Sequence, residues 1–257
     1  MTSSFIIRFK WFVMKQDEVE LVASSASGGL GSLWVSLSEV YNLSPRVYER
    51  GSLAVSLFQI RRWRAEALRV GMTKESIILD AGSGKGALSE ILRQRGVSTI
   101  MMDANFGLLK AGYGDRVQGM FERPPFRAGV FDYVVMSFSL HAAGDYGKAI
   151  EGMRAVLKRG GFFLSVGIGK PRSLFKLFLI NAYLTFAVPL LAVIATGRNY
   201  RFFKQIKVVF RVSPTNDELK SELGAYFQTL SFKEFALGAV YEFLGEKPRA
   251  LCFIFCR

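Results

Sequence analysis

Cysteine is scarce in this sequence of 257 residues: the chain has two, Cys252 and Cys256, four positions apart in a C-terminal apolar run. If that run is a strand, the two side chains share a face about 13 Å apart, which is too far for a disulfide. We therefore expect two free thiols in the core of a protein from a reducing compartment. Histidine is scarcer still, with His141 alone, and no metal site is expected.

Acidic residues are absent from residues 170–211, which carry eight Lys and Arg side chains. The whole chain has a net charge of +13, so this segment contributes +8 of it. A charge of this size suits phosphate contacts, but a nucleic-acid-binding protein would set its basic residues among polar ones. Here they flank residues 177–196, a run of 20 residues without a charge. A nucleic acid is therefore not the expected partner.

The uncharged run is long enough to cross a membrane as a helix. A single crossing would, however, separate the last strands of the chain from the earlier ones, and Pro189 divides the run. We expect two interfacial helices that cover a pocket, with the flanking basic residues at the anionic headgroups of a membrane surface. A lid buried in an oligomer interface, such as a homodimer, and a membrane span are the alternatives.

The N-terminal residues lack the pattern of a targeting segment. Their apolar patch is interrupted by Arg8 and Lys10, and it is too short and broken for a signal peptide or a membrane span. Residues 22–33 are rich in Ser and Gly and are typical of a flexible link. We expect residues 1–40 to form an arm and linker, and residues 41–257 to form one domain with 170–211 as a lid or membrane-facing insertion.

Two common nucleotide-binding loops are missing, although the chain has a glycine-rich turn at residues 77–86, Ile-Ile-Leu-Asp-Ala-Gly-Ser-Gly-Lys-Gly. The glycine spacing does not match the dinucleotide motif G-x-G-x-x-G, and a P-loop would need glycine at Leu79 and Ser or Thr at Gly86. What remains resembles the D-x-G-x-G-x-G motif of the class I S-adenosylmethionine (SAM) methyltransferases. An ordinary glycine turn between a strand and a helix is the alternative.

Apolar strands alternate with helical patterns along the chain, half of which is hydrophobic. The expected strands lie at residues 76–80, 98–103, 116–118, 130–138, 162–167, 230–237 and 249–256. The alternation predicts βαβ crossovers and a parallel sheet. The last two runs, joined by Gly-Glu-Lys-Pro at 245–248, suit an antiparallel edge. The predicted fold class is α/β, a doubly wound, mostly parallel, Rossmann-like sheet of seven strands with an antiparallel last strand.

The resemblance to class I methyltransferases implies a SAM site at the carboxyl ends of the first strands. Asp103 closes the second strand, where its carboxylate can accept both ribose hydroxyls of a nucleoside; a helix N-terminal acid is the alternative. Asp80 is expected to fix the glycine loop or to reach the amino acid end of SAM through water. Met120 stands where the family usually carries an acid for the adenine amino group, so adenine is expected on apolar side chains and on the Phe121 backbone. The other residues expected at the cofactor are Gly82, Ser83, Gly84, Gly86, Ala104 and Ser137.

The fourth strand ends in Ser-Phe-Ser-Leu-His at residues 137–141, where a doubly wound sheet opens toward substrate. This segment lacks the Asn/Asp-Pro-Pro-aromatic signature of many nucleobase and glutamine methyltransferases. His141 is the candidate for a general base with a pKa near 7. A histidine with a structural role only is the alternative.

A narrower resemblance covers about residues 41–257. Its segments are Ser-Pro-Arg-Val-Tyr at 44–48, Arg-Trp-Arg at 62–64, Ala-Val-Leu-Lys-Arg-Gly-Gly at 155–161, Gly-Ile-Gly-Lys-Pro at 167–171, and the apolar stretch beyond. Together they resemble the ubiquinone/menaquinone biosynthesis C-methyltransferase family. The resemblance implies SAM-dependent methylation of a ring carbon on a polyprenylated quinol, with Tyr48 covering the cofactor. The chain departs from the family at His141, which replaces an arginine, and at Lys85, which replaces a threonine.

The predicted function is therefore SAM-dependent C-methylation of a lipophilic quinol, such as a demethylmenaquinone or ubiquinone precursor, by a cytoplasmic enzyme at the inner membrane face. The first alternative is a methyltransferase of another lipid, isoprenoid or small molecule. An RNA methyltransferase and a non-catalytic module with the SAM-binding fold are the others.

Overall fold

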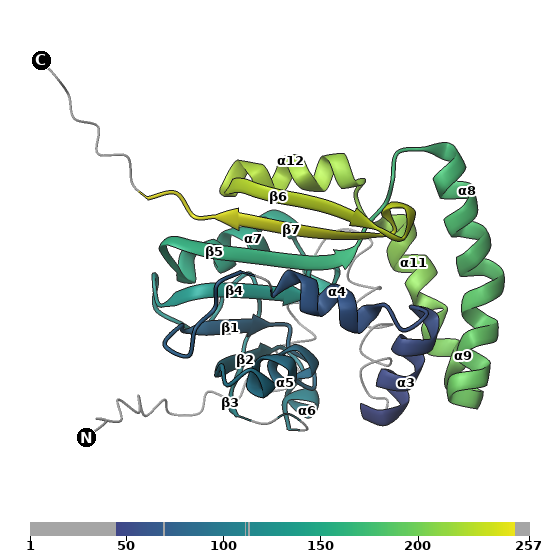
Figure 1. Cartoon of the computed structure of the whole chain (residues 1–257), viewed down its shortest axis with the longest axis horizontal. Helices are drawn as coiled ribbons and strands as arrows, with labels where there is room; N and C mark the ends of the chain where they lie inside the picture. Colours follow the sequence, from purple (N-terminus) through teal and green to yellow (C-terminus); the bar gives the residue numbers. More distant parts are fainter. Residues whose placement is uncertain (1–44, 69, 111, 113, 250–257) are drawn as a thin grey trace, which may run out of the picture.

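The computed structural model describes residues 45–68, 70–110, 112 and 114–249 of the chain. These residues form one seven-stranded sheet with helices on both faces and a group of helices beyond one end (Figure 1). The predicted arm at residues 1–40 lies outside the described residues, as do Cys252 and Cys256.

The first five strands lie close to their predicted positions and pair in parallel in the order β3-β2-β1-β4-β5. They are β1 (Ile78–Ala81), β2 (Thr99–Asp103), β3 (Asp115–Gln118), β4 (Phe131–Ser137) and β5 (Leu157–Ile168). The connecting helices are α5 (Ala87–Gln94) after β1, α6 (Phe106–Leu109) after β2 and α7 (Tyr146–Val156) after β4. Because β2 and β4 lie on opposite sides of β1, the strand order reverses there. A crevice opens at such a point, outside the carboxyl ends of the strands.

Each face of the sheet buries its own apolar layer. On one face α7 and α12 (Asn216–Tyr226) pack their apolar stripes on the sheet, and the rings of Phe163 and Phe227 stack with centroids 4.7 Å apart. On the other face α5 contributes Leu88 and Leu92, next to Leu68 at the end of α4 (Ile60–Ala67). The two layers hold the sheet rigid, so that loops at its carboxyl edge are fixed in place.

The end of the sheet differs in part from the prediction. The antiparallel last strand is confirmed: β7 (Val240–Glu246) lies between β5 and β6 (Gln228–Phe235), antiparallel to both. The expected turn at 245–248 is wrong, because Gly245 belongs to β7, and a side chain there would collide with the Cβ of Phe227 and the ring of Phe243. The turn is instead made at residues 236–239, where Ala236 and Leu237 have positive φ angles. The predicted strand at 249–256 lies almost wholly outside the described residues.

The uncharged run forms one continuous helix rather than the two expected. It consists of α8 (Leu174–Ala182), the π-helical turn η2 (Tyr183–Ala187) and α9 (Val188–Thr196), which we call the apolar helix. The Val188 N–H donates to the Tyr183 carbonyl, five residues back. Pro189 follows in the first turn of α9, a position that proline tolerates, so the helix continues.

The chain returns from the apolar helix through η3 (Gly197–Asn199), α10 (Tyr200–Phe203) and α11 (Gln205–Val212). Among the described residues, the helical segment 174–203, which includes the apolar helix, is long and apolar enough to cross a membrane by length and composition alone. β5 precedes the helix and β7 follows it, and the two strands pair along their length. A single crossing would therefore pull paired strands apart, as expected from the sequence.

Candidate functional site

The loop after β1 contains three glycines in the left-handed region. Gly82, Gly84 and Gly86 have φ angles of 70°, 54° and 79°. The N–H groups of Gly82 and Ser83 both donate to the Met102 carbonyl, at 2.7 and 3.0 Å. These bonds hold the loop across the carboxyl ends of β1 and β2, at the point where the strand order reverses.

The three glycines differ in the space that surrounds them. A side chain at Gly82 would collide with Ser139, and one at Gly86 would lie 3.0 Å from the sulfur of Met101. At Gly84 a side chain would meet no atom of the described residues within 4 Å. The loop is thus packed at both ends and open in the middle, where a ligand can approach the main chain closely.

Asp103 ends β2 beside this opening. One carboxylate oxygen, Oδ2, accepts the Gly84 N–H at 2.8 Å, and Oδ1 accepts the Asn105 N–H at 2.8 Å. Burial raises the pKa of Asp103, and the two backbone bonds oppose that shift. A carboxylate has about four acceptor positions, so each oxygen keeps capacity for a hydroxyl donor. The neighbouring Ala104 carbonyl accepts the side-chain amide of Gln118 at 2.9 Å, which ties this turn to β3.

Helix α3 (Pro45–Val55) brings Tyr48 to the same place. Burial raises the pKa of Tyr48, Arg64 and a hydrogen bond with Ser52 oppose the shift, and the charge of Asp103 adds to it. The phenol therefore lies within electrostatic reach of Asp103, although the two residues are far apart in the sequence.

Arg64 belongs to one of the segments that resemble the quinone methyltransferases, but the sequence predicted no role for it at the site. Its side chain is buried, with 6% of the residue exposed, and a guanidinium nitrogen lies 3.7 Å from the Glu49 carboxylate. Its charge lowers the pKa of both Tyr48 and Asp80. The spacing could have predicted that Arg64 is buried. Ile60, Arg64 and Leu68 lie four residues apart on one helical stripe, and the two apolar members of the stripe are buried.

The end of β4 is strained. Phe138 has a φ of 53° between Ser137 and Ser139, and its N–H donates to the Val166 carbonyl at 2.6 Å. The Ser139 hydroxyl donates to the Ala81 carbonyl at 2.8 Å. A bulky residue in the left-handed region is uncommon and marks functional sites. The strain turns the chain sharply where the crevice opens.

Met120 and Phe121 lie beside the glycine loop, because the Gly119 N–H donates to the Asp103 carbonyl at 3.1 Å. The ring of Phe121 is buried in the core and would meet a side chain at Gly82 at 2.8 Å. Met120 is half-buried. The ring of Phe121 thus packs against the glycine loop at Gly82. The segment that carries Met120 and Phe121 borders the crevice.

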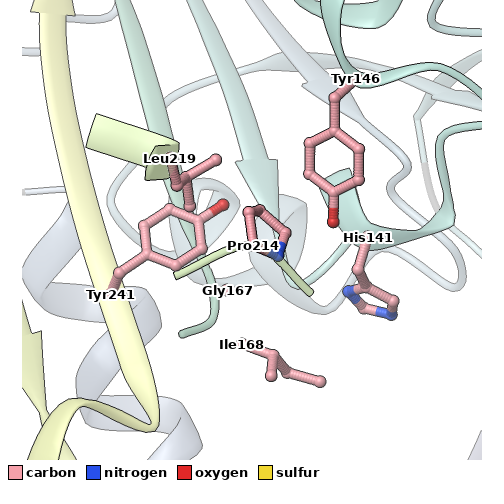
Figure 2. A pocket seen from close by; sticks show the side chains of 7 residues that line it. All are labelled: His141, Tyr146, Gly167, Ile168, Pro214, Leu219 and Tyr241. Atoms are coloured by element: carbon pink, nitrogen blue, oxygen red, sulfur yellow. The ribbon is translucent and has the colours of Figure 1, made fainter. Parts of the chain in front are cut away.

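His141 lines a small pocket beyond the carboxyl ends of β4 and β5, with Tyr146, Gly167, Ile168, Pro214, Leu219 and Tyr241 (Figure 2). Its Nδ1 is buried and accepts or donates no hydrogen bond among the described residues. Burial lowers the pKa of His141 to about 4. The expected pKa near 7 is therefore wrong: the imidazole is neutral at neutral pH and is a weaker base than the sequence predicted.

Two tyrosines flank this pocket with their hydroxyls pointing inward (Figure 2). Burial raises the pKa of Tyr146 to about 12, with a hydrogen bond to Ser213 in opposition. Burial also raises the pKa of Tyr241, whose hydroxyl lies 2.8 Å from that of Ser165. Both phenols stay protonated at neutral pH, so the pocket offers hydrogen-bond donors without a charge.

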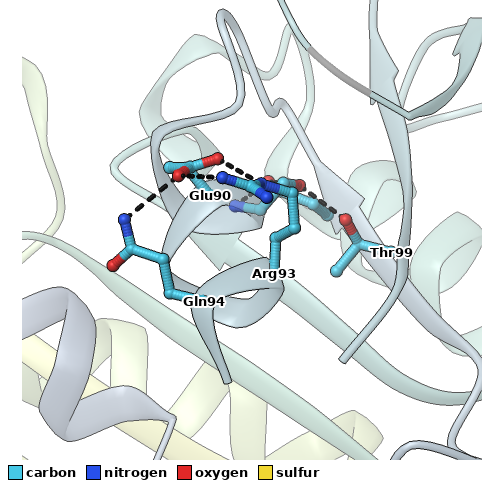
Figure 3. Close-up of polar contacts among 6 residues, drawn as sticks. Glu90, Arg93, Gln94 and Thr99 are labelled. Carbon is cyan, nitrogen blue, oxygen red and sulfur yellow. Dashed lines mark hydrogen bonds and ion pairs between the residues drawn. The ribbon is translucent and has the colours of Figure 1, made fainter. Parts of the chain in front are cut away.

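Asp80 anchors the helix that follows the glycine loop. Its Oδ2 accepts the Ser89 N–H at 3.2 Å and the Ser89 hydroxyl at 2.7 Å, and the Thr99 hydroxyl in turn donates to Ser89. Farther along α5, Glu90 bonds with Arg93 and Gln94 on the exposed side (Figure 3). Burial raises the pKa of Asp80 to about 6, while the Ser89 bonds and Arg64 lower it.

Unsatisfied polar atoms gather at the crevice. Among the described residues, five buried side-chain polar atoms have no hydrogen-bond partner. Four belong to residues at the carboxyl ends of β1 and β4, namely Asp80 Oδ1, Ser83 Oγ, Ser137 Oγ and His141 Nδ1; the fifth is Glu242 Oε2. Such atoms cost free energy unless a ligand or water completes them.

These features fit SAM. The Asp103 carboxylate offers acceptors for ribose hydroxyls, and the open main chain at Gly84 allows close approach. Four buried polar atoms without a partner belong to residues at the carboxyl ends of β1 and β4. Arg64 supplies one buried positive charge next to Asp80.

Comparison with known proteins agrees with this geometry. Residues 79–165 match the family model described as a methyltransferase domain. A demethylmenaquinone methyltransferase of Mycobacterium marinum is 28% identical over 211 residues, which cover 79% of this chain and 90% of that protein. One of Paenarthrobacter aurescens is 28% identical over 203 residues, covering 76% and 79%.

Solved structures show the same fold at lower identity. A chain from the complex of the Haloferax volcanii Trm112 methyltransferase activator with a methyltransferase has a TM-score of 0.56 and 14% identity. It covers 78% of this chain and 98% of its own. A SAM-dependent methyltransferase of Thermotoga maritima has a TM-score of 0.52 and 20% identity, covering 78% and 94%. Residues 79–165 are thus a methyltransferase domain, the chain has the class I methyltransferase fold, and SAM is the methyl donor that this domain and site imply.

Proposed function

We propose that the chain transfers the methyl group of SAM to a ring carbon of a lipophilic quinol, such as a demethylmenaquinone or a ubiquinone precursor. One observation carries the proposal: a largely exposed apolar helix packs on α3, the same helix that holds Tyr48 against the cofactor crevice. An apolar surface beside a methyl-transfer site favours a greasy substrate. The names of the curated relatives support the same substrate class.

In this proposal the cofactor lies across the carboxyl ends of β1 and β2. Asp103 accepts hydrogen bonds from the ribose, the main chain of the glycine loop faces the amino acid tail, and Tyr48 covers the nucleoside. Ser83 and Ser137 supply hydroxyls whose partners are missing among the described residues. Ala104, Met120 and Phe121 border the base, and Asp80 holds the loop and α5 together.

When bound, SAM supplies a methyl group already activated by its sulfonium, so the enzyme mainly aligns the acceptor carbon behind it. His141 Nδ1 accepts the proton of a ring hydroxyl, and the electron pair released makes the ring carbon nucleophilic. That carbon would then take the methyl group, and the sulfur would keep the electron pair of the broken bond as a neutral thioether. The proton of the ring carbon would return to the ring oxygen, and His141 would release its own proton to solvent. A base within hydrogen-bond reach contributes roughly 10²–10⁴-fold, and the low pKa of His141 favours the lower end.

The proposal includes the organisation expected from the sequence. Residues 41–257 act as one domain, residues 170–211 face a membrane surface, and the enzyme works on the cytoplasmic side, where its quinol is dissolved in the bilayer. A nucleic acid substrate is not favoured, because the basic residues flank an exposed apolar helix.

Product analysis tests the substrate class. The protein is incubated with methyl-labelled SAM and a membrane lipid extract, and separately with total RNA. The expected result is one labelled lipid, heavier than a quinol of the extract by one methylene, with label on a ring carbon. A labelled lipid without a quinol ring would favour the alternative, a methyltransferase of another lipid or isoprenoid. Label in RNA alone would refute the proposal.

A further inference from the structure

The apolar helix is apolar on two opposite sides. One stripe, Ile180, Leu184, Val188 and Ala192, is buried against Val55 of α3, Phe203 of α10 and Phe210 of α11. A second stripe is exposed to solvent, and its large apolar members are Leu174, Phe175, Phe178, Leu179, Phe186, Leu190, Val193 and Ile194. Figure 1 shows α8 and α9 along one side of the molecule, beyond the sheet.

The exposure is too large for a helix of a soluble core. Phe175 and Phe178 are each 70% exposed, Phe186 is 76% exposed, and 22% of the most apolar 18-residue window is buried. A helix that is hydrophobic all round belongs in an apolar environment on every side. A contiguous apolar stripe of about 30 Å, from 20 residues at 1.5 Å each, marks a surface that another apolar phase covers.

The charges near the stripe identify that phase. Arg172 precedes α8 by two residues and Arg198 follows α9 by two residues, so a basic residue stands at each end of the exposed stripe. Both are exposed, as are Arg201, Lys204 and Arg211, and no acidic residue occurs between positions 170 and 211. An apolar face flanked by basic residues, in a segment without an acidic residue, is complementary to an anionic lipid surface.

Two further apolar side chains, Leu57 and Phe58, are exposed to solvent beside this helix. Tyr183 of η2 donates from its hydroxyl to the Val55 carbonyl at 3.0 Å, so the end of α3 lies against the middle of the apolar helix. Two residues later, Leu57 and Phe58 have positive φ angles of 49° and 64° and are 55% and 72% exposed. Two strained non-glycine residues that present apolar side chains to solvent are expected where those side chains have a partner.

We propose that the exposed stripe of α8 and α9, together with Leu57 and Phe58, docks onto an anionic phospholipid bilayer with the helix lying in the plane of the membrane surface. The apolar side chains enter the boundary of the acyl chains, and the flanking Arg and Lys residues contact the lipid phosphates. The docking itself does not depend on the proposed function. Its biological purpose, the capture of a substrate dissolved in lipid, rests on the proposed function.

Two other occupants of this face are outcomes of the test. A transmembrane position is disfavoured because β5 and β7, which flank the segment, pair in one sheet. A second copy of the chain would bring eight basic residues of each segment together without an acid to offset them. Docking on the surface of an anionic bilayer neither separates β5 from β7 nor brings basic segments together.

Vesicle flotation without SAM or substrate tests the inference. Wild type is expected to float with phosphatidylglycerol vesicles and to remain in solution with phosphatidylcholine vesicles, and high salt should release most of it. Phe178→Glu and Phe186→Glu should each reduce the bound fraction at least tenfold. The matched control is Leu230→Glu on β6, where a leucine that is 47% exposed lies outside this face; it should float like wild type.

Three outcomes would overturn the inference: wild type that does not float, phenylalanine variants that float as well as wild type, or protein that stays in the vesicles after carbonate extraction. If the phenylalanine variants convert a dimer to a monomer and leave flotation unchanged, the face is an interface between copies. Because flotation needs no turnover, its failure with intact lipid methylation rejects the docking alone. Flotation without methylation of any quinol rejects the proposed substrate alone.

Discussion

The ring of Phe203 in α10 occupies the space where a side chain on Gly51 in α3 would lie. Gly51 is buried, and Tyr48 stands three residues before it on the same helix. The α10 ring therefore fixes how closely α3 approaches the apolar helix on one side and the cofactor crevice on the other. Through this contact the position of Tyr48 depends on the helices of the 170–211 segment.

Gly51→Leu should thus affect both stability and cofactor binding. The added side chain overpacks the contact with Phe203, at an expected cost of about 1–3 kcal/mol in the free energy of unfolding. Displacement of α3 moves Tyr48 and should weaken SAM affinity severalfold, measured by calorimetry. Gly71→Leu is the control, because a side chain there meets nothing within 4 Å. Equal SAM affinity in both variants would show that α3 does not transmit the change.

Asp103→Asn tests the ribose-binding role. Hydrogen bonds to a charged acceptor contribute about 1.5–3 kcal/mol, so the variant should bind SAM roughly 10- to 100-fold more weakly. Asp132→Asn is a matched control, since the Asp132 carboxylate also accepts a backbone N–H, from Ile77 at 2.9 Å, but at the opposite end of the sheet. Calorimetric affinities that fall equally in both variants would contradict a specific role for Asp103.

The pKa of His141 predicts a dependence of stability on pH. Burial lowers the folded-state pKa from 6.5 to about 4, so between these values the unfolded chain binds a proton that the folded chain does not. Stability is therefore present above pH 6.5 and is lost as the pH falls toward 4, by up to about 3 kcal/mol from this group.

Chemical denaturation of wild type and His141→Gln from pH 7.5 to 4.5 measures this effect. The free energy of unfolding of wild type should fall relative to that of His141→Gln as the pH decreases. Parallel curves would mean that His141 titrates normally in the folded state. Single-turnover methyl transfer at pH 7.5 separates the chemical role, because a base should be needed for the rate and not for SAM affinity.

The sequence predicted the first strands and the glycine loop well, because their determinants are local. The first apolar run ends in Asp80 and is followed by alternating glycines, a pattern that predicts β1 and the loop after it. The next apolar run ends in Asp103 and predicts β2. The end of the chain was less predictable. Gly245 has turn chemistry, but packing against Phe227 and Phe243 keeps it in β7, and the real turn uses Ala236 and Leu237 in a conformation that their residue types disfavour.

The burial of individual charged and polar side chains was also beyond the sequence. The neutral state of His141 depends on how fully the pocket encloses it, and Pro189 was expected to end a helix that a π turn carries through. Arg64 is one of three arginines within four residues of α4, and only its place on the stripe of Ile60 and Leu68 distinguishes it.

Arg64→Gln tests the role of that buried charge. Asp80 has a folded-state pKa of about 6, above its usual 3.8, so the folded chain keeps its proton longer than the unfolded chain does and loses stability as the pH rises through 6. Arg64 offsets part of this cost because its charge favours ionised Asp80. The free energy of unfolding of Arg64→Gln should therefore fall further below that of wild type at pH 8 than at pH 5.

Arg61→Gln provides the comparison on the same helix. Arg61 also contacts Glu49, at 3.6 Å, but its side chain is 67% exposed, whereas that of Arg64 is 7% exposed. Its removal should change stability little and equally at both pH values, because an exposed ion pair is screened by solvent. If the deficit of Arg64→Gln were the same at pH 5 and pH 8, the charge of Arg64 would not act on Asp80, and its burial would reflect packing alone.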